Sequence, residues 1–164
     1  MNVFRSFLTT DELALLLPYL ASDGYEPGRQ GTGYEKLSLR NTDETQALRK
    51  RCLVALGLPE DTGHDAYIVR YPTGTRIPLH KDDAPLASEH HRINCMVLPA
   101  ERGGELFVSG VPCDLRARDA YTFRPDLEEH EVSEVLAGVR AIFSVGAWLK
   151  ARRHGPALDG PPDL

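Results

Sequence analysis

Cysteine is scarce in this chain, and long apolar runs are missing. Its 164 residues include three cysteines, an odd number whose spacing fits neither a disulfide framework nor a zinc-binding motif. Reduced thiols in a cytoplasmic protein are the simplest interpretation. No segment reaches the roughly 18 apolar residues of a membrane-spanning helix, and residues 1–13 lack the pattern of a signal peptide. We therefore expect a cytoplasmic protein with no membrane partner.

Positive charge is limited as well. The formal net charge is −5, and no long basic block precedes the last fifteen residues. Because duplex binding depends on Lys and Arg to neutralise phosphates, we expect no nucleic-acid partner. The length suits one compact domain whose core does not need a metal for stability. We expect this domain over residues 1–150 and a disordered, Pro- and Gly-rich tail over residues 151–164.

Helical signals are confined to the first third of the chain. Thr9 and Glu12 form a capping box, which predicts a helix over about 10–20 that Pro18 bends or ends. A second helix is predicted over about 41–57, where an apolar stripe favours packing on a sheet.

From residue 66 onward the pattern changes to short β-rich runs separated by Gly- and Pro-containing turns. Six or more such runs at close spacing favour a sandwich or jelly roll. The predicted fold class is therefore mostly β with N-terminal helices (α+β), in which two helices pack on one face of a sheet.

The stretch after the first β run contains His80 and Asp82, two residues apart. If the chain is extended there, both side chains lie on the same side. A His-x-Asp pair alone is common enough by chance to be nearly uninformative. His130 also stands at the start of a predicted strand. Two histidines and one carboxylate are the donor set of non-haem Fe(II) oxygenases, so the three residues together are a candidate metal site.

Arg140 lies within an otherwise apolar strand, on the same face as Ser144. A buried arginine is costly unless its charge is paired. Guanidinium binds carboxylate through a bidentate pair of hydrogen bonds, so Arg140 could hold an anion, with Ser144 adding a hydroxyl. The alternative is a salt bridge to an acidic residue on a neighbouring strand.

These residues follow the order Y-x2-G-x5-H-x-D, then GGEL, then H-x9-R. The pattern comprises Tyr71, Gly74, His80, Asp82, Gly103, Gly104, Glu105, Leu106, His130 and Arg140. Over residues 66–150 it resembles the Fe(II)/2-oxoglutarate-dependent dioxygenases, in particular the prolyl 4-hydroxylase-like branch.

The resemblance implies a double-stranded β-helix, that is, a jelly roll of the cupin-like type. It also implies roles for single residues. Fe(II) would be bound by His80, Asp82 and His130. The co-substrate 2-oxoglutarate would be bound by Arg140 at its distal carboxylate, with Ser144 and Tyr71 contributing hydroxyl groups.

The implied activity uses dioxygen and 2-oxoglutarate, releases succinate and carbon dioxide, and has ascorbate as a supporting reductant. It would hydroxylate an aliphatic C–H bond of a prolyl or amino-acid residue, or of a small biosynthetic intermediate. A carboxylate at Asp82 argues against a halogenase. The alternatives are a demethylase or repair-type oxygenase and a non-oxidative, cupin-like metal-binding module. The sequence does not identify the substrate.

The chain departs from the family pattern at Leu98 and Pro99, near which many relatives carry a tyrosine that contacts 2-oxoglutarate. We therefore expect the pocket to rely more on Arg140, Ser144 and Tyr71. Four further residues are not assigned to the site. His90 and His91 are expected in a polar lid loop, where either could touch substrate, Arg92 is expected at the surface or at the cavity mouth, and Trp148 is expected in the core.

Overall fold

The computed structural model describes residues 1–29, 31–85 and 87–150. The predicted disordered tail, residues 151–164, lies outside the described residues. Within the described part of the chain, no helix is both long and apolar enough to cross a membrane.

Both predicted helices are present, and both are shorter than expected. Helix α1 spans Thr10–Leu16 and continues as a 3₁₀ turn over Leu17–Ala21 that contains Pro18. The capping box is confirmed, because the Glu12 amide donates to the Thr9 hydroxyl and the Thr9 amide donates to the Glu12 carboxylate. Helix α2 spans Gln46–Ala55 and follows a 3₁₀ turn over Asp43–Thr45.

The strands form one large and one small antiparallel sheet, with a short two-stranded ribbon beside them. The large sheet has the order β1 (Asn2–Phe4), β10 (Ala120–Phe123), β6 (Ser88–Leu98), β13 (Arg140–Lys150), β4 (Asp65–Tyr71), β3 (Glu35–Ser38) and β2 (Glu26–Pro27). The small sheet has the order β5 (Ile77–His80), β11 (His130–Val132), β8 (Leu106–Val108) and β9 (Val111–Cys113). The ribbon pairs β12 (Val135–Ala137) with β7 (Arg102–Gly103).

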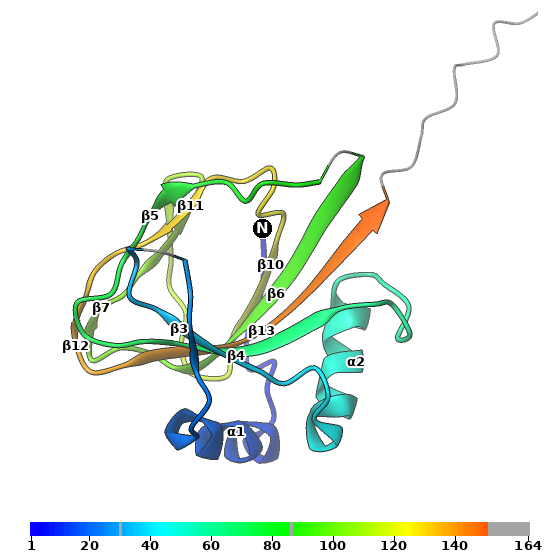
Figure 1. Cartoon of the computed structure of the whole chain (residues 1–164), viewed down its shortest axis with the longest axis horizontal. Helices are drawn as coiled ribbons and strands as arrows, with labels where there is room; N and C mark the ends of the chain where they lie inside the picture. The colour runs from blue at the N-terminus through cyan, green and yellow to red at the C-terminus, as the bar shows by residue number, and fades with distance from the viewer. Residues whose placement is uncertain (30, 86, 151–164) are drawn as a thin grey trace, which may run out of the picture.

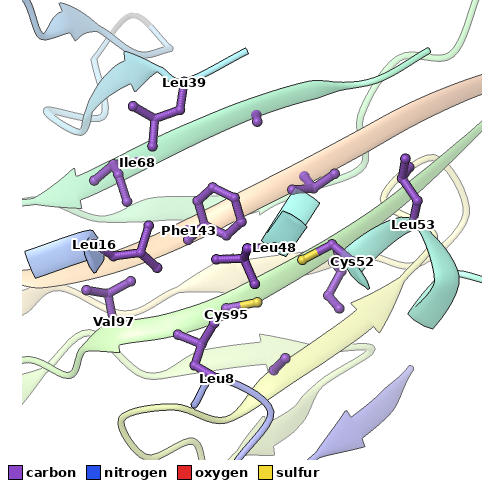
Figure 2. Close-up of a cluster of buried hydrophobic side chains, with 14 of the residues drawn as sticks. Leu8, Leu16, Leu39, Leu48, Cys52, Leu53, Ile68, Cys95, Val97 and Phe143 are labelled. Atoms are coloured by element: carbon purple, nitrogen blue, oxygen red, sulfur yellow. The ribbon is translucent and has the colours of Figure 1, made fainter. Parts of the chain in front are cut away.

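The main hydrophobic core lies between the large sheet and the two helices, which cover one face of that sheet (Figure 1). Leu16 from α1 and Leu48 from α2 meet Phe143 of β13 there (Figure 2). The alternation predicted for β13 is confirmed, because Ala141, Phe143, Val145 and Ala147 belong to this core. The intervening residues of the strand point to the opposite face of the sheet.

On that opposite face the small sheet packs against the large one. Leu106, Val108 and Val132 of the small sheet form a second cluster with Tyr121 and Phe123 of the large sheet. Two facing antiparallel sheets, with helices outside the larger one, make a double-stranded β-helix, so the predicted fold class is confirmed.

Candidate active site

The candidate metal ligands come together at one end of the small sheet. His80 ends β5 and His130 begins β11, and the two residues lie directly opposite each other in the strand pairing. Asp82 was expected on the same strand as His80, but β5 ends at His80 and Asp82 lies in the loop that follows. Its amide donates to the carbonyl of Pro125 at 2.8 Å, which holds this loop beside the sheet. One donor atom from each of the three residues lies within 4.8 Å of the others.

Hydrogen bonds prepare both imidazoles to bind a metal through the same nitrogen. Nδ1 of His80 lies 2.8 Å from the carbonyl of Pro78, and Nδ1 of His130 lies 3.0 Å from the carbonyl of Glu128. Because a carbonyl can only accept, each Nδ1 carries a proton, and in the neutral ring Nε2 is then the nitrogen with the lone pair. This arrangement is common among metal-binding histidines, in which the second nitrogen fixes the orientation of the ring.

Charge states at the site also suit a divalent cation. Burial lowers the pKa of His130, which favours the neutral imidazole that binds metals. Burial alone would raise the pKa of Asp82, but the nearby imidazoles of His90, His130 and His80 outweigh it and lower that pKa to about 2. Near neutral pH Asp82 is therefore ionised. Two neutral imidazoles and one carboxylate fit Fe(II) and leave coordination positions for other ligands.

The three ligands border a cavity of about 460 Å³ between the two sheets. Its apolar wall consists of Val69, Ile77, Leu106, Phe123, Val132 and Ile142. Polar groups from the large sheet also face it, including the hydroxyls of Tyr71, Tyr121 and Ser144. The lining is about as polar as it is apolar, so the cavity suits a small molecule that carries charged or polar groups.

Arg140 begins β13 opposite Tyr71 of β4, and its side chain is only 1% exposed. The guanidinium lies 4.7 Å from the centre of the Tyr71 ring. Within the described part of the chain, none of its three nitrogens has a hydrogen-bond partner. The described residues therefore do not show the alternative, a salt bridge between Arg140 and an acidic residue on a neighbouring strand.

The guanidinium lies where two cavities approach each other. Tyr71 and Tyr121 line the main cavity, and the positive charge of Arg140 opposes the effect of burial, which raises the pKa of both tyrosines. Arg140 itself lines a second cavity of about 400 Å³, in which Gly104 and Leu106 also take part. Leu106 lies on both cavities. An unpaired, buried cation at this position could hold an anion.

Ser144 faces the main cavity, but its hydroxyl contacts a different arginine. It accepts a hydrogen bond of 2.7 Å from Nη1 of Arg92, and Arg92 also pairs with Asp65 at 3.2 Å. Of the two positions considered for Arg92, the structure favours the cavity over the surface, because its side chain lines the cavity and is only 17% exposed.

Three other residues around the site also differ from expectation. His90 and His91 do not form a lid loop, because both belong to strand β6. His90 is almost fully buried and lines the cavity. Trp148, expected in the core, is 42% exposed at the same cavity, where its ring stacks on that of His90.

Asn94 and Tyr121 were missed altogether, although both line the cavity. The amide of Asn94 donates to the Tyr121 hydroxyl at 2.7 Å. Following every second residue along β6 from His90 and Arg92 leads to Asn94, so the strand alternation could have identified this residue. Tyr121 lay in a short run of apolar and β-branched residues, which gives no signal for a functional side chain.

Comparison with known proteins gives matches by structure only. No family model and no curated protein sequence matches the chain. A prolyl 4-hydroxylase from Pseudomonas putida is 19% identical with a TM-score of 0.71, and the match covers 92% of each chain. A prolyl hydroxylase from Trichoplax adhaerens, in complex with a peptide of the hypoxia-inducible factor oxygen degradation domain, is 17% identical with a TM-score of 0.69. That match covers 91% of this chain and 83% of the other.

A third similar structure is a viral collagen prolyl hydroxylase from Paramecium bursaria Chlorella virus-1 in complex with 2-oxoglutarate. It is 16% identical with a TM-score of 0.67, and the match covers 92% of this chain and 94% of the other. In all three cases the match covers more than nine tenths of this chain. The chain therefore has the double-stranded β-helix fold of the prolyl 4-hydroxylases.

Proposed function

We propose that this protein is an Fe(II)/2-oxoglutarate-dependent dioxygenase that hydroxylates an aliphatic C–H bond. The observation that carries the proposal is the convergence of His80, Asp82 and His130 within 4.8 Å, at the edge of a cavity between the sheets. The buried, unpaired guanidinium of Arg140 supports it, because this residue supplies a binding group for an anionic co-substrate.

Each residue has a defined task in this proposal. His80 and His130 present Nε2 to the metal, since their Nδ1 protons are bound to backbone carbonyls. Asp82 supplies a negative charge that partly neutralises the cation. Iron bound there would couple the reduction of dioxygen to oxidative decarboxylation of 2-oxoglutarate, which gives succinate and carbon dioxide.

The anion-binding end of the site depends on residues of the large sheet. Arg140 would pair with the distal carboxylate of 2-oxoglutarate, and the Tyr71 hydroxyl would donate a hydrogen bond to it. Burial raises the pKa of Tyr71 to about 12, so this hydroxyl keeps its proton at neutral pH. Tyr121, beside Arg140, would contribute a second hydroxyl where the family's usual tyrosine is replaced near Leu98. Ser144 would act through Arg92, whose guanidinium it holds.

The proposed substrate is a prolyl or amino-acid residue, or a small biosynthetic intermediate. A prolyl hydroxylase of the same fold binds a peptide, which supports a peptidyl substrate. The apolar part of the cavity wall offers a surface for the aliphatic part of such a substrate.

A metal-binding module without oxygenase activity is the main rival. Such a module needs the three ligands but has no use for a buried cation near its metal. Arg140 therefore separates the two functions, because an unpaired guanidinium destabilises the fold unless a ligand makes use of it.

An anaerobic titration with Fe(II) and 2-oxoglutarate tests the proposal. The parent protein should develop the weak visible charge-transfer band of a chelated complex. Asp82→Ala should abolish the band, and Arg140→Met should require much higher 2-oxoglutarate concentrations. A folded, metal-loaded parent protein without a band would contradict the proposal and favour the non-oxidative module.

A further inference from the structure

His90 is a buried polar residue that lies beside the candidate metal ligands. The proposed chemistry gives it no role. Its side chain is 2% exposed and lies opposite Trp148 in the pairing of β6 with β13. The two rings stack with their centres 3.9 Å apart and an interplanar angle of 13°. This stacking fixes the plane of the imidazole, and the two ring nitrogens then point at two different neighbours.

One of these nitrogens faces a cation. Nε2 of His90 lies 3.3 Å from Nε of Arg92 and 3.2 Å from Nη2 of the same guanidinium. Guanidinium has donors only, so Nε2 must be the acceptor. The ring proton of the neutral imidazole is therefore on Nδ1.

Nδ1 faces the carboxylate of Asp82. It lies 3.5 Å from Oδ2, slightly beyond a normal hydrogen bond, and it has no other partner among the described residues. The second oxygen of the carboxylate, Oδ1, is directed differently: it accepts a hydrogen bond of 3.2 Å from Nη2 of Arg29 and lies 3.4 Å from Nε2 of His80. His90 thus faces one oxygen of Asp82, while the other lies toward Nε2 of His80 and is paired with Arg29, whose place a metal ion would take.

Arg92 is itself held firmly in place. Its guanidinium donates to the hydroxyl of Ser144 and pairs with Asp65. Gly146 provides the room, since a Cβ at that position would lie 2.5 Å from Nη2 of Arg92. Asp65 therefore compensates the charge of Arg92, and His90 only accepts hydrogen bonds from this arginine.

We propose that His90 is a positioning residue for the metal ligand Asp82, with Arg92 fixing the tautomer that makes this possible. The Nδ1 proton holds Oδ2, which leaves Oδ1 as the single metal-binding oxygen. A carboxylate bound through one oxygen occupies one coordination position and keeps the others open for co-substrate and dioxygen. This inference rests on the metal site of the proposed function. Outer partners of metal ligands typically change metal affinity about 10- to 100-fold when they are lost.

Anaerobic binding of Co(II) provides the test, because its visible ligand-field spectrum reports the geometry of the ligands independently of catalysis. His90→Leu should weaken Co(II) binding about 10- to 100-fold and alter the spectrum. His90→Asn should restore most of the affinity, since its amide can place a donor near the position of Nδ1. His91→Leu is the matched control, because His91 lies on the opposite side of the same strand and pairs with Glu89. It should leave both readouts unchanged.

If His90→Leu does not fold, the comparison of His90→Asn with His90→Gln replaces it. Glutamine carries its amide farther from the backbone, near the position of Nε2. The His90→Gln protein should therefore bind Co(II) as weakly as a variant without a donor at the position of Nδ1. Equal affinity and equal spectra for parent, Leu and Gln variants would overturn the positioning role while leaving the metal site intact. A parent protein that binds no Co(II) would instead refute the proposed function, and this inference with it.

Discussion

Replacing Arg140 by methionine should make the ligand-free protein more stable and unable to respond to 2-oxoglutarate. Methionine fills a similar length of the buried site without a charge. The guanidinium that it replaces is 1% exposed, and its three nitrogens lack hydrogen-bond partners in the part of the chain that the structure describes. Its favourable contact is with the face of the Tyr71 ring.

The size of the effect follows from these two opposing contributions. An unsatisfied buried donor costs about 1–3 kcal/mol, and a desolvated cation–π contact returns about 0.5–2 kcal/mol. Because all three nitrogens are unsatisfied and only one cation–π contact opposes their cost, the free energy of unfolding of Arg140→Met should exceed that of the parent by at least about 1 kcal/mol. For a chain of this length, a change of 1 kcal/mol shifts Tm by about 2–4 °C, so Tm should rise by at least about 2 °C.

The assay is anaerobic thermal unfolding with Mn(II), with and without 2-oxoglutarate. The ligand should raise the Tm of the parent and leave that of Arg140→Met unchanged. Arg70→Met is the matched control, because Arg70 on the adjacent strand is paired with Glu35 and packs on the Tyr25 ring. That variant should lose stability and keep its response to the ligand. A ligand-free Arg140→Met protein that is less stable than the parent, or that is still stabilised by 2-oxoglutarate, would refute the reasoning.

Three further predictions concern the helix cap, the glycine beside Arg140 and the metal-binding carboxylate. Thr9→Ala should lower the free energy of unfolding by about 1 kcal/mol in chemical denaturation, because the capping box of α1 is lost; no loss would show that the cap contributes nothing. Gly104→Ala should weaken 2-oxoglutarate binding in calorimetric titration, because the new Cβ would lie 3.3 Å from Cδ of Arg140. Backbone strain alone should not have this effect. Gly110→Ala is the control, because Gly110 has a similar φ (+75° against +69°) but lies in open space, and this variant should keep the affinity. Asp82 has a folded-state pKa of about 2, below its ordinary value of 3.8, so its ionised form stabilises the metal-free protein above about pH 4 and this contribution is lost as the pH falls to about 2. Asp82→Asn should flatten the pH dependence of unfolding in that window, and an unchanged curve would contradict the pKa.

The parts of the fold that the sequence predicts are those with local signals. The capping box at Thr9 marks the start of α1, and the alternation around Phe143 separates the core face of β13 from the cavity face. Helix lengths were overestimated, because the residues before α2 and after α1 adopt 3₁₀ turns that leave no distinct pattern. The pairing of β5 with β11, which brings His80 opposite His130, depends on contacts 50 residues apart and could be anticipated only through the family resemblance.

In the candidate site, too, residues with a local sequence signal could be predicted, and contacts between distant strands could not. His80, Asp82 and His130 follow a spacing that points to a metal, and the structure brings them together. The contact of Ser144 with Arg92 could not be anticipated, because Arg92 belongs to another strand. His90 was read as part of a loop since polar residues surround it, and only the length of β6 shows that it is a buried strand residue.

Formation of succinate is the most direct test of the proposed 2-oxoglutarate-dependent dioxygenase activity. Fe(II), 2-oxoglutarate and dioxygen are supplied to the parent protein, and succinate is measured in the absence of an added substrate, where slow uncoupled turnover is expected. Succinate is expected from the parent, background levels from Asp82→Ala, and a strongly raised requirement for 2-oxoglutarate with Arg140→Met. A folded, iron-loaded parent that forms no more succinate than Asp82→Ala would contradict the assignment as a 2-oxoglutarate-dependent dioxygenase.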